Sequence, residues 1–143
     1  MKVIVLVGLP GSGKSTWAEA QGITVISSDR VRQLLADDAT NQRIHVEVFS
    51  TMRYLLKRRL QLGAAATIVD ATNLLPVFRK PWIKIAQAFD AQIEAVYFDT
   101  PLEECLRRNA GRTRVVPAEA IIEMARKLRP PTKAEGFTRQ RRP

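Results

Sequence analysis

Apolar runs and amphipathic segments alternate along the chain. One continuous aliphatic run, 3–7, and three largely apolar segments, 23–26, 66–69 and 93–98, are strand candidates. Unbroken runs of this length are typical of strands that are buried on both faces. Between them, apolar residues recur at helical spacing, most clearly over 44–62, and Gly63 is a usual residue after a helix C-terminus. Strands that alternate with helices predict an α/β fold with a parallel sheet of four or five strands, covered by helices on both faces.

Two proline-containing segments indicate where later helices begin. Thr100 precedes Pro101 and stands three residues before Glu103, which is the pattern of a capping box with proline at the first helical position. Pro117 opens the last predicted helix. Parallel α/β sheets bind ligands at the carboxyl ends of their strands, so the residues that follow each strand are the first candidates for chemistry.

Length and composition fit one globular domain. The 143 residues are 45% hydrophobic and 26% charged, which argues against disorder throughout. The longest aliphatic run, 3–7, is too short for a membrane span or for the core of a secretory signal. The single cysteine cannot form an internal disulfide. We therefore expect a single cytoplasmic domain over 1–143 that does not associate with membranes.

The net charge of the chain is +9, and it is unevenly distributed. Residues 101–143 contain eleven Lys and Arg residues against five Asp and Glu, and they end in a basic, Pro/Arg-rich tail over 129–143. Contacts between basic side chains and phosphates release counterions, so a polyanionic partner such as nucleic acid is the direct interpretation. A basic surface without a partner is the alternative.

One motif after the first predicted strand carries specific chemistry. Its sequence, Gly8-Leu9-Pro10-Gly11-Ser12-Gly13-Lys14-Ser15, matches the phosphate-binding pattern G-x-x-x-x-G-K-[ST]. In such a loop, backbone N–H groups surround the phosphate oxygens, the lysine reaches the β- and γ-phosphates, and the final hydroxyl binds Mg²⁺. The residues expected to bind ATP are Gly8, Pro10, Gly11, Ser12, Gly13, Lys14, Ser15 and Thr16, with Ser15 as the metal ligand. The sequence lacks the Asn-Lys-x-Asp motif of GTPases, which leaves a small kinase with a P-loop kinase fold as the best class.

Polar residues follow the second and third predicted strands. Asp29 is expected opposite the γ-phosphate, where a carboxylate can accept the proton of an attacking hydroxyl, although Asp also caps helices. Arg32 lies one helical turn later and can hold an anionic acceptor group. We expect Asp70 and Asn73 near the acceptor, with Asp70 orienting Mg²⁺ waters or holding a substrate-binding arginine. A structural turn is the competing interpretation of this segment.

Four arginines and no acidic residue occupy 107–114: Arg107, Arg108, Arg112 and Arg114. Helical spacing places Arg108 and Arg112 on one side, and Gly111 indicates that the helix ends in a lid over about 108–117. Arginines on such a lid close over a triphosphate and neutralise charge in the transition state. A solvated basic face is the ordinary alternative. Five further basic residues could extend an acceptor track or face solvent: Lys57, Arg58, Arg59, Arg79 and Lys80.

Taken together, these residues resemble the 5′-hydroxyl polynucleotide kinases. That family includes the phage end-healing enzyme and the kinase module of bacterial RNA-repair polynucleotide kinase-phosphatases. The resemblance rests on the segments 8–18, 28–29, 70–73 and 108–112, and it is closest to the bacterial module through 25–29, 57–63 and 69–73. It covers roughly 3–137. Many kinases share the phosphate-binding loop, so the specificity lies in Asp29, Asp70, Arg108 and Arg112.

The resemblance implies a role for each matching residue. On the donor side, Lys14 and Ser15 bind the phosphates and Mg²⁺, and Arg108 contacts the donor phosphates. On the acceptor side, Asp29 activates the 5′-hydroxyl and Arg32 binds a phosphate of the acceptor strand. Asp70 is an essential acid, and Arg112 is the arginine of the lid that acts in the transition state. Kinase modules of the family usually continue into a fifth strand, which is expected to be short or missing here.

The leading prediction is an ATP- and Mg²⁺-dependent kinase that transfers the γ-phosphate to the 5′-hydroxyl ends of DNA or RNA by direct in-line attack, in nucleic-acid repair. Two alternatives remain. One is a kinase that uses the same loop to phosphorylate a small metabolite, sugar or antibiotic. The other is a non-catalytic nucleic-acid-binding module that binds ATP as a structural ligand.

Overall fold

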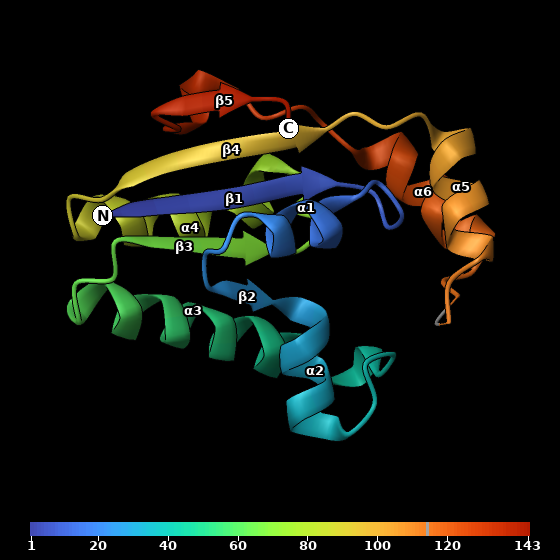
Figure 1. Ribbon diagram of the computed structural model, residues 1–143, viewed down its shortest axis with the longest axis horizontal. Helices are drawn as coiled ribbons and strands as arrows, with labels where there is room; N and C mark the ends of the chain where they lie inside the picture. Colours follow the sequence, from blue (N-terminus) through green and yellow to red (C-terminus); the bar gives the residue numbers. More distant parts are fainter. Residues whose placement is uncertain (114) are drawn as a thin grey trace.

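The computed structural model describes residues 1–113 and 115–143, and it has a five-stranded parallel sheet at its centre (Figure 1). The strands are β1 (Lys2–Gly8), β2 (Val25–Ser27), β3 (Ala66–Asp70), β4 (Gln92–Phe98) and β5 (Arg139–Arg141). Their order across the sheet is β2-β3-β1-β4-β5. Each hydrogen-bonded pair is parallel, so the carboxyl ends of the strands meet at one edge.

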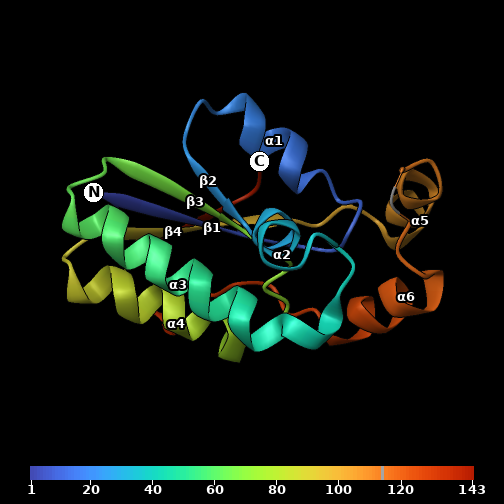
Figure 2. The ribbon, with the colours of Figure 1, turned by 90° about the horizontal axis from the view of Figure 1, so that it is seen from below.

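Helices cover both faces of this sheet, as the sequence predicted. They are α1 (Lys14–Ala20), α2 (Ser28–Ala36), α3 (His45–Gln61), α4 (Pro76–Ala88), α5 (Leu102–Ala110) and α6 (Ala118–Lys127), with 3₁₀ turns η1 (Gln42–Ile44) and η2 (Lys133–Glu135). Figure 2 shows α3 and α4 together beneath one face and α1 on the opposite face. Helices α5 and α6 lie beyond the carboxyl ends of β1 and β4 (Figures 1 and 2).

The main core lies between the sheet and the α3–α4 layer. Every second residue of β1, namely Val3, Val5 and Val7, packs into this layer, while Ile4 and Leu6 face α1. Helix α3 contributes a stripe of buried residues at a spacing of four: Val48, Met52, Leu56 and Leu60. Because β1 is buried on both faces, its sequence reads as one continuous apolar run rather than as an alternating one.

Helix α1 covers only part of its face of the sheet, and charged side chains cover the strands beside it. Glu94 of β4 is only 3% exposed, and it is paired with Lys2 of β1 at 3.8 Å and with Arg141 of β5. The Arg141 guanidinium also lies 5.5 Å from the ring centroid of Trp17 in α1. The fifth strand is therefore present but short, and an ion pair fastens it to β4.

One expectation about the helix starts is wrong and one agrees with the structure. Helix α5 begins at Leu102 without a side-chain cap, so the capping box predicted from Thr100 and Glu103 is wrong. The Thr100 hydroxyl instead donates to the carbonyl of Ser12 at 2.9 Å, across 88 residues of sequence. Helix α6 does begin directly after Pro117. Within 1–113 and 115–143, no helix is long and apolar enough to cross a membrane.

Candidate active site

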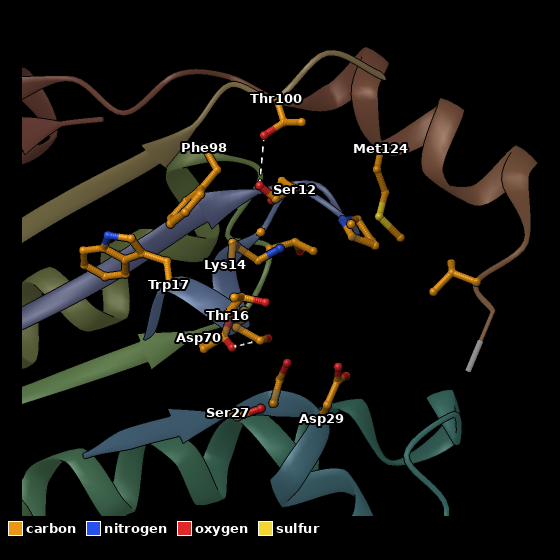
Figure 3. Close-up of a pocket in the computed structure, with 18 of the residues that line it drawn as sticks. Ser12, Lys14, Thr16, Trp17, Ser27, Asp29, Asp70, Phe98, Thr100 and Met124 are labelled. Atoms are coloured by element: carbon orange, nitrogen blue, oxygen red, sulfur yellow. Dashed lines mark hydrogen bonds between the residues drawn. The ribbon is translucent and has the colours of Figure 1, made fainter. Parts of the chain in front are cut away.

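A cleft of about 930 Å³ opens at the carboxyl ends of the strands. The loop after β1, the start of α2, the end of β3 and the α5–α6 region all contribute to its lining. In Figure 3, Lys14, Asp29 and Asp70 point toward this space from three different elements, and Met124 points toward it from α6. The parallel sheet thus gathers the residues that the sequence places after separate strands.

The loop between β1 and α1 has the geometry of an anion cradle. Gly11 and Gly13 have φ angles of +81° and +98°, and a Cβ on Gly11 would lie 2.6 Å from the carbonyl oxygen of Cys105. Only glycine adopts these angles at such close approach without strain. Within the described part of the chain, no side chain caps the start of α1, so its first N–H groups are available to phosphate oxygens.

Lys14 occupies the inside of this loop. Its ammonium group donates to the carbonyl oxygens of Gly8 at 3.0 Å and Leu9 at 2.8 Å. Burial lowers the pKa of Lys14 to about 8, although the carboxylates of Asp70 and Asp29 act in the opposite direction. Within the described residues, the hydrogen-bond partners of this buried ammonium are backbone carbonyls, and an anionic ligand such as a polyphosphate would offset its cost of burial.

Ser12 is a second residue of this loop that fits an anionic ligand. Its side-chain oxygen is buried and has no hydrogen-bond partner among the described residues. Buried hydroxyls are rarely left unpaired in folded proteins, and unpaired ones are often associated with an absent ligand. Together with the glycine angles and Lys14, this hydroxyl makes the loop a good fit for the phosphates of a nucleoside triphosphate.

Ser15 and Asp70 form the second polar pair of the cleft. The Ser15 hydroxyl donates to Asp70 Oδ2 at 2.8 Å. Burial raises the pKa of Asp70, and this is opposed by the charge of Lys14 and by the hydrogen bond from Ser15. A hydroxyl and a carboxylate are hard oxygen donors of the type that Mg²⁺ prefers, and Mg²⁺ takes its remaining ligands from phosphates and water. These two residues therefore fit a magnesium ion beside the donor phosphates.

Asp29 and Arg32 lie on the first turns of α2, which starts immediately after β2. The cap of this helix is Ser27, whose hydroxyl accepts from the Arg30 N–H at 3.3 Å, so Asp29 is not required as a cap. The Asp29 side chain is 45% exposed and lies 3.7 Å from the Arg32 guanidinium, which is only 6% exposed. Arg32 Nε has no hydrogen-bond partner in the described residues. Both side chains line the cleft, so an accessible carboxylate stands beside a buried, incompletely satisfied guanidinium.

The predicted lid residues also reach the cleft. Arg108, in the last turn of α5, donates to Glu104 at 2.9 Å and to the carbonyl of Gly11 at 3.5 Å, which places its guanidinium against the phosphate-binding loop. The guanidinium groups of Arg107 and Arg108 keep the pKa of Glu104 low, at about 2. Arg112 lines the cleft from the segment between α5 and α6. Arg114 lies outside the described residues.

The structure does not bring Asn73 into this group, and the expectation that it binds the acceptor is wrong. Asn73 is 3% exposed and does not line the cleft. Its amide donates to the Leu6 carbonyl at 2.8 Å, and its side-chain oxygen accepts from the Trp82 indole at 3.0 Å. It therefore ties the β3–α4 connection to β1. This is the turn interpretation that the sequence left open.

Arg79 is a core residue rather than part of an acceptor track. It is fully buried and donates to the carbonyls of Asn73 at 2.8 Å and Leu74 at 2.9 Å, and it pairs with Glu135 at 2.9 Å. Arg59 is also occupied, because it donates to Thr67 and Ala66 at the amino end of β3. None of the five basic residues that were candidates for an acceptor track lines the cleft: Lys57, Arg58, Arg59, Arg79 and Lys80.

Sequence reasoning missed several residues of the cleft: Trp17, Gln42, His45, Phe49, Phe98, Thr100 and Met124. Most of them belong to no sequence motif, because residues that only line a cleft determine its shape and need no particular chemical group. Two signals were nevertheless present. Thr100 follows the fourth predicted strand at the edge where ligands bind, and His45 and Phe49 stand four residues apart, on one side of a helix.

Comparison with known proteins agrees with this geometry. A family model described as "AAA domain" matches residues 3–131, which is most of the chain. The chain belongs to this family. A curated relative, the bifunctional polynucleotide phosphatase/kinase of Schizosaccharomyces pombe, is 28% identical over 144 residues, covering 96% of this chain and 32% of that protein. The L-seryl-tRNA(Sec) kinase of Methanococcus maripaludis is 30% identical over 136 residues, covering 90% of this chain and 53% of that protein.

Solved structures show that this AAA-family chain has the fold of P-loop kinases. The Pnkp1/Rnl/Hen1 RNA repair complex contains a chain that superposes with a TM-score of 0.76 at 22% identity, over 89% of this chain and 43% of the other. The chain spans about a third of the length of the S. pombe relative and about half the length of the M. maripaludis relative. The chain therefore combines the fold of P-loop kinases with a phosphate-binding loop and a buried lysine, and its relatives include kinases.

Proposed function

We propose that residues 1–143 form a single kinase domain that transfers the γ-phosphate of ATP to the 5′-hydroxyl end of a polynucleotide. The observation that carries this proposal is the pairing of Asp29 with Arg32 in the phosphate cleft. Asp29 is accessible enough to take a proton from a hydroxyl. Arg32 offers a buried guanidinium that suits a phosphate next to that hydroxyl. A nucleotide at a 5′ end presents both groups.

The reaction is a direct transfer with one attacking hydroxyl. The 5′-oxygen forms a bond to the γ-phosphorus, its proton passes to the Asp29 carboxylate, and the bond from the γ-phosphorus to the β-bridging oxygen breaks to release ADP. Three cationic side chains stabilise the negative charge on the transferred phosphoryl group: Lys14, Arg108 and Arg112. Ser15 and Asp70 would hold Mg²⁺, which neutralises charge on the donor phosphates when bound.

The charge of the molecule and its relatives support a polynucleotide acceptor. A net charge of +9 favours a polyanionic substrate over a neutral sugar or antibiotic. The polynucleotide phosphatase/kinase of S. pombe and the RNA repair complex are both concerned with nucleic acids by their names. A role in repairing nucleic-acid ends follows from this proposal.

A second candidate substrate is an aminoacylated RNA. The relative from M. maripaludis is an L-seryl-tRNA(Sec) kinase, and its acceptor is a serine hydroxyl carried on an RNA. The same carboxylate could serve such a hydroxyl. In that case the phosphate held by Arg32 would belong to the RNA rather than to the nucleotide that is phosphorylated.

The test is phosphate transfer from γ-labelled ATP to a synthetic oligonucleotide with a free 5′-hydroxyl. The same oligonucleotide with a 5′-phosphate is the matched control. We expect label on the first substrate only, with Mg²⁺ required. Absence of label from both substrates, under conditions in which ATP is bound, would exclude the proposed activity.

A further inference from the structure

The edge of the cleft beside α2 is aromatic. His45, the first residue of α3, and Phe49, one turn later, both line the cleft, and their ring centroids lie 4.6 Å apart at an angle of 37°. The Phe49 ring lies 6.4 Å from the fully buried ring of Trp82. Three rings therefore run from the core to the surface of the cleft. This aromatic series, His45–Phe49–Trp82, ends at an exposed imidazole.

The series is rigid at its inner end and accessible at its outer end. The Trp82 indole donates to Asn73, which in turn donates to β1, so the innermost ring is fixed to the sheet. In residues 1–113 and 115–143, the His45 ring packs on Phe49 and forms no hydrogen bond or ion pair. Core packing explains the half-buried Phe49. The His45 ring is exposed and lines the cleft, so it is accessible to a ligand there.

The position of the series relative to Asp29 and Arg32 suggests its ligand. All of these residues line one cleft, and α2 packs against α3. If Arg32 holds the phosphate nearest to the reacting hydroxyl, the nucleoside that carries this hydroxyl lies between Asp29 and the His45 edge. Met124 points into the cleft from α6 (Figure 3), and Figure 2 shows α6 across from the N-terminal end of α3. The space for the nucleoside therefore has an aromatic wall and a thioether wall.

The geometry points to a nucleobase subsite: the base of the 5′-terminal acceptor nucleotide stacks on the His45 ring, with Phe49 behind it. This inference rests on the proposed function and adds how the acceptor is selected. Aromatic rings stack with any base because every base has a π face, so the subsite reads the presence of a base rather than its identity. It would favour polynucleotides over small hydroxyl compounds without imposing a sequence.

The test measures the phosphorylation of two 5′-hydroxyl oligonucleotides that differ only in the terminal nucleotide. One carries a base, and the other carries an abasic tetrahydrofuran at that position. With the base, we expect His45→Ala to raise the KM for the oligonucleotide by about 5- to 150-fold, the range that base–aromatic stacking gives on alanine substitution. With the abasic substrate, the same variant should match the wild type. His45→Phe should retain most of the affinity, because it restores an aromatic ring.

A matched control separates stacking from folding. Val46→Ala changes the next residue of α3, which is 73% exposed and does not line the cleft, so both substrates should react as with the wild type. An equal loss on both substrates, or no loss on either, would overturn the subsite while the kinase activity stands. If the wild-type protein labels neither oligonucleotide, the proposed function itself fails, and the subsite fails with it.

Discussion

The buried ammonium of Lys14 makes a quantitative prediction about the pH dependence of ATP binding. Burial lowers the pKa of Lys14 from 10.5 to about 8 in the free protein. A bound triphosphate supplies the negative charge that the loop lacks, so the pKa of Lys14 in the complex should return toward its ordinary value. Each pKa unit corresponds to about 1.4 kcal/mol. ATP should therefore bind to the protein with a charged Lys14 more tightly than to the protein with a neutral Lys14. The difference in binding free energy is about 3 kcal/mol, or roughly 300-fold in affinity.

The sign of the effect follows from which state binds the proton. Below pH 8, Lys14 is charged in both the free protein and the complex, so this residue adds no pH dependence. Between about pH 8 and 10.5, the complex retains a proton that the free protein has lost, and ATP affinity falls by up to about tenfold per pH unit. Stability of the free protein responds in the opposite direction. The unfolded chain keeps its proton in this window, so the contribution of Lys14 to the free energy of unfolding rises with pH.

Isothermal titration calorimetry between pH 7.5 and 9.5 measures this coupling directly. At pH 9, runs in two buffers of different ionisation enthalpy should show the uptake of nearly one proton per ATP bound. The Lys14→Met variant is the control, because its weaker binding should not change over this range. An affinity that stays constant from pH 7.5 to 9.5 in the wild type, without proton uptake, would refute the reasoning.

Three further predictions concern turnover and stability. Asp29→Asn should lower kcat by about 10²- to 10⁴-fold and leave the Kd for ATP unchanged, since it removes only the proton acceptor; a collapse of ATP binding in calorimetry would instead give Asp29 a structural role. Glu135→Gln should cost about 3–5 kcal/mol in urea denaturation, because it leaves the Arg79 guanidinium buried without its ion pair, and a loss below 1 kcal/mol would contradict this. Gly11→Ala should abolish ATP binding, since its Cβ would lie 2.6 Å from the carbonyl oxygen of Cys105. Gly22→Ala is the control: Gly22 has a φ of +66°, but a Cβ there would meet no atom within 4 Å. This variant should lose only about 1–2 kcal/mol of stability and no ATP affinity.

The positions of the strands and of the phosphate-binding loop could be predicted because local sequence determines them. The apolar run at 3–7 becomes β1, and the glycines after it adopt angles that other residues avoid. Asp29 and Asp70 could be assigned to the cleft because carboxyl ends of parallel strands converge at one edge. Arg112 could be assigned from the cluster of arginines after the predicted helix. Periodicity and motif spacing suffice where the chemistry lies close to a strand end.

Other features depend on contacts between distant segments, which a sequence pattern does not specify. Thr100 has the residues of a capping box around it, but a carbonyl of the phosphate-binding loop offers its hydroxyl a better partner. Asn73 follows a strand like a site residue, yet the Trp82 indole and the Leu6 carbonyl take its polar atoms. Arg79 is a candidate surface cation in the sequence, and its burial depends on Glu135 from the C-terminal segment and on the carbonyls of Asn73 and Leu74.

The most direct test of the central claim compares kcat/KM for two RNA acceptors under identical ATP and Mg²⁺ concentrations. One is an oligonucleotide with a free 5′-hydroxyl, and the other is seryl-tRNA whose 5′ end is already phosphorylated. The pairing of Asp29 with Arg32 predicts that the free 5′ end is the better substrate by at least about tenfold, with all label released as the 5′-terminal nucleotide on nuclease digestion. Preferential labelling of the seryl hydroxyl would contradict the proposed function and assign the cleft to the other class of RNA kinase.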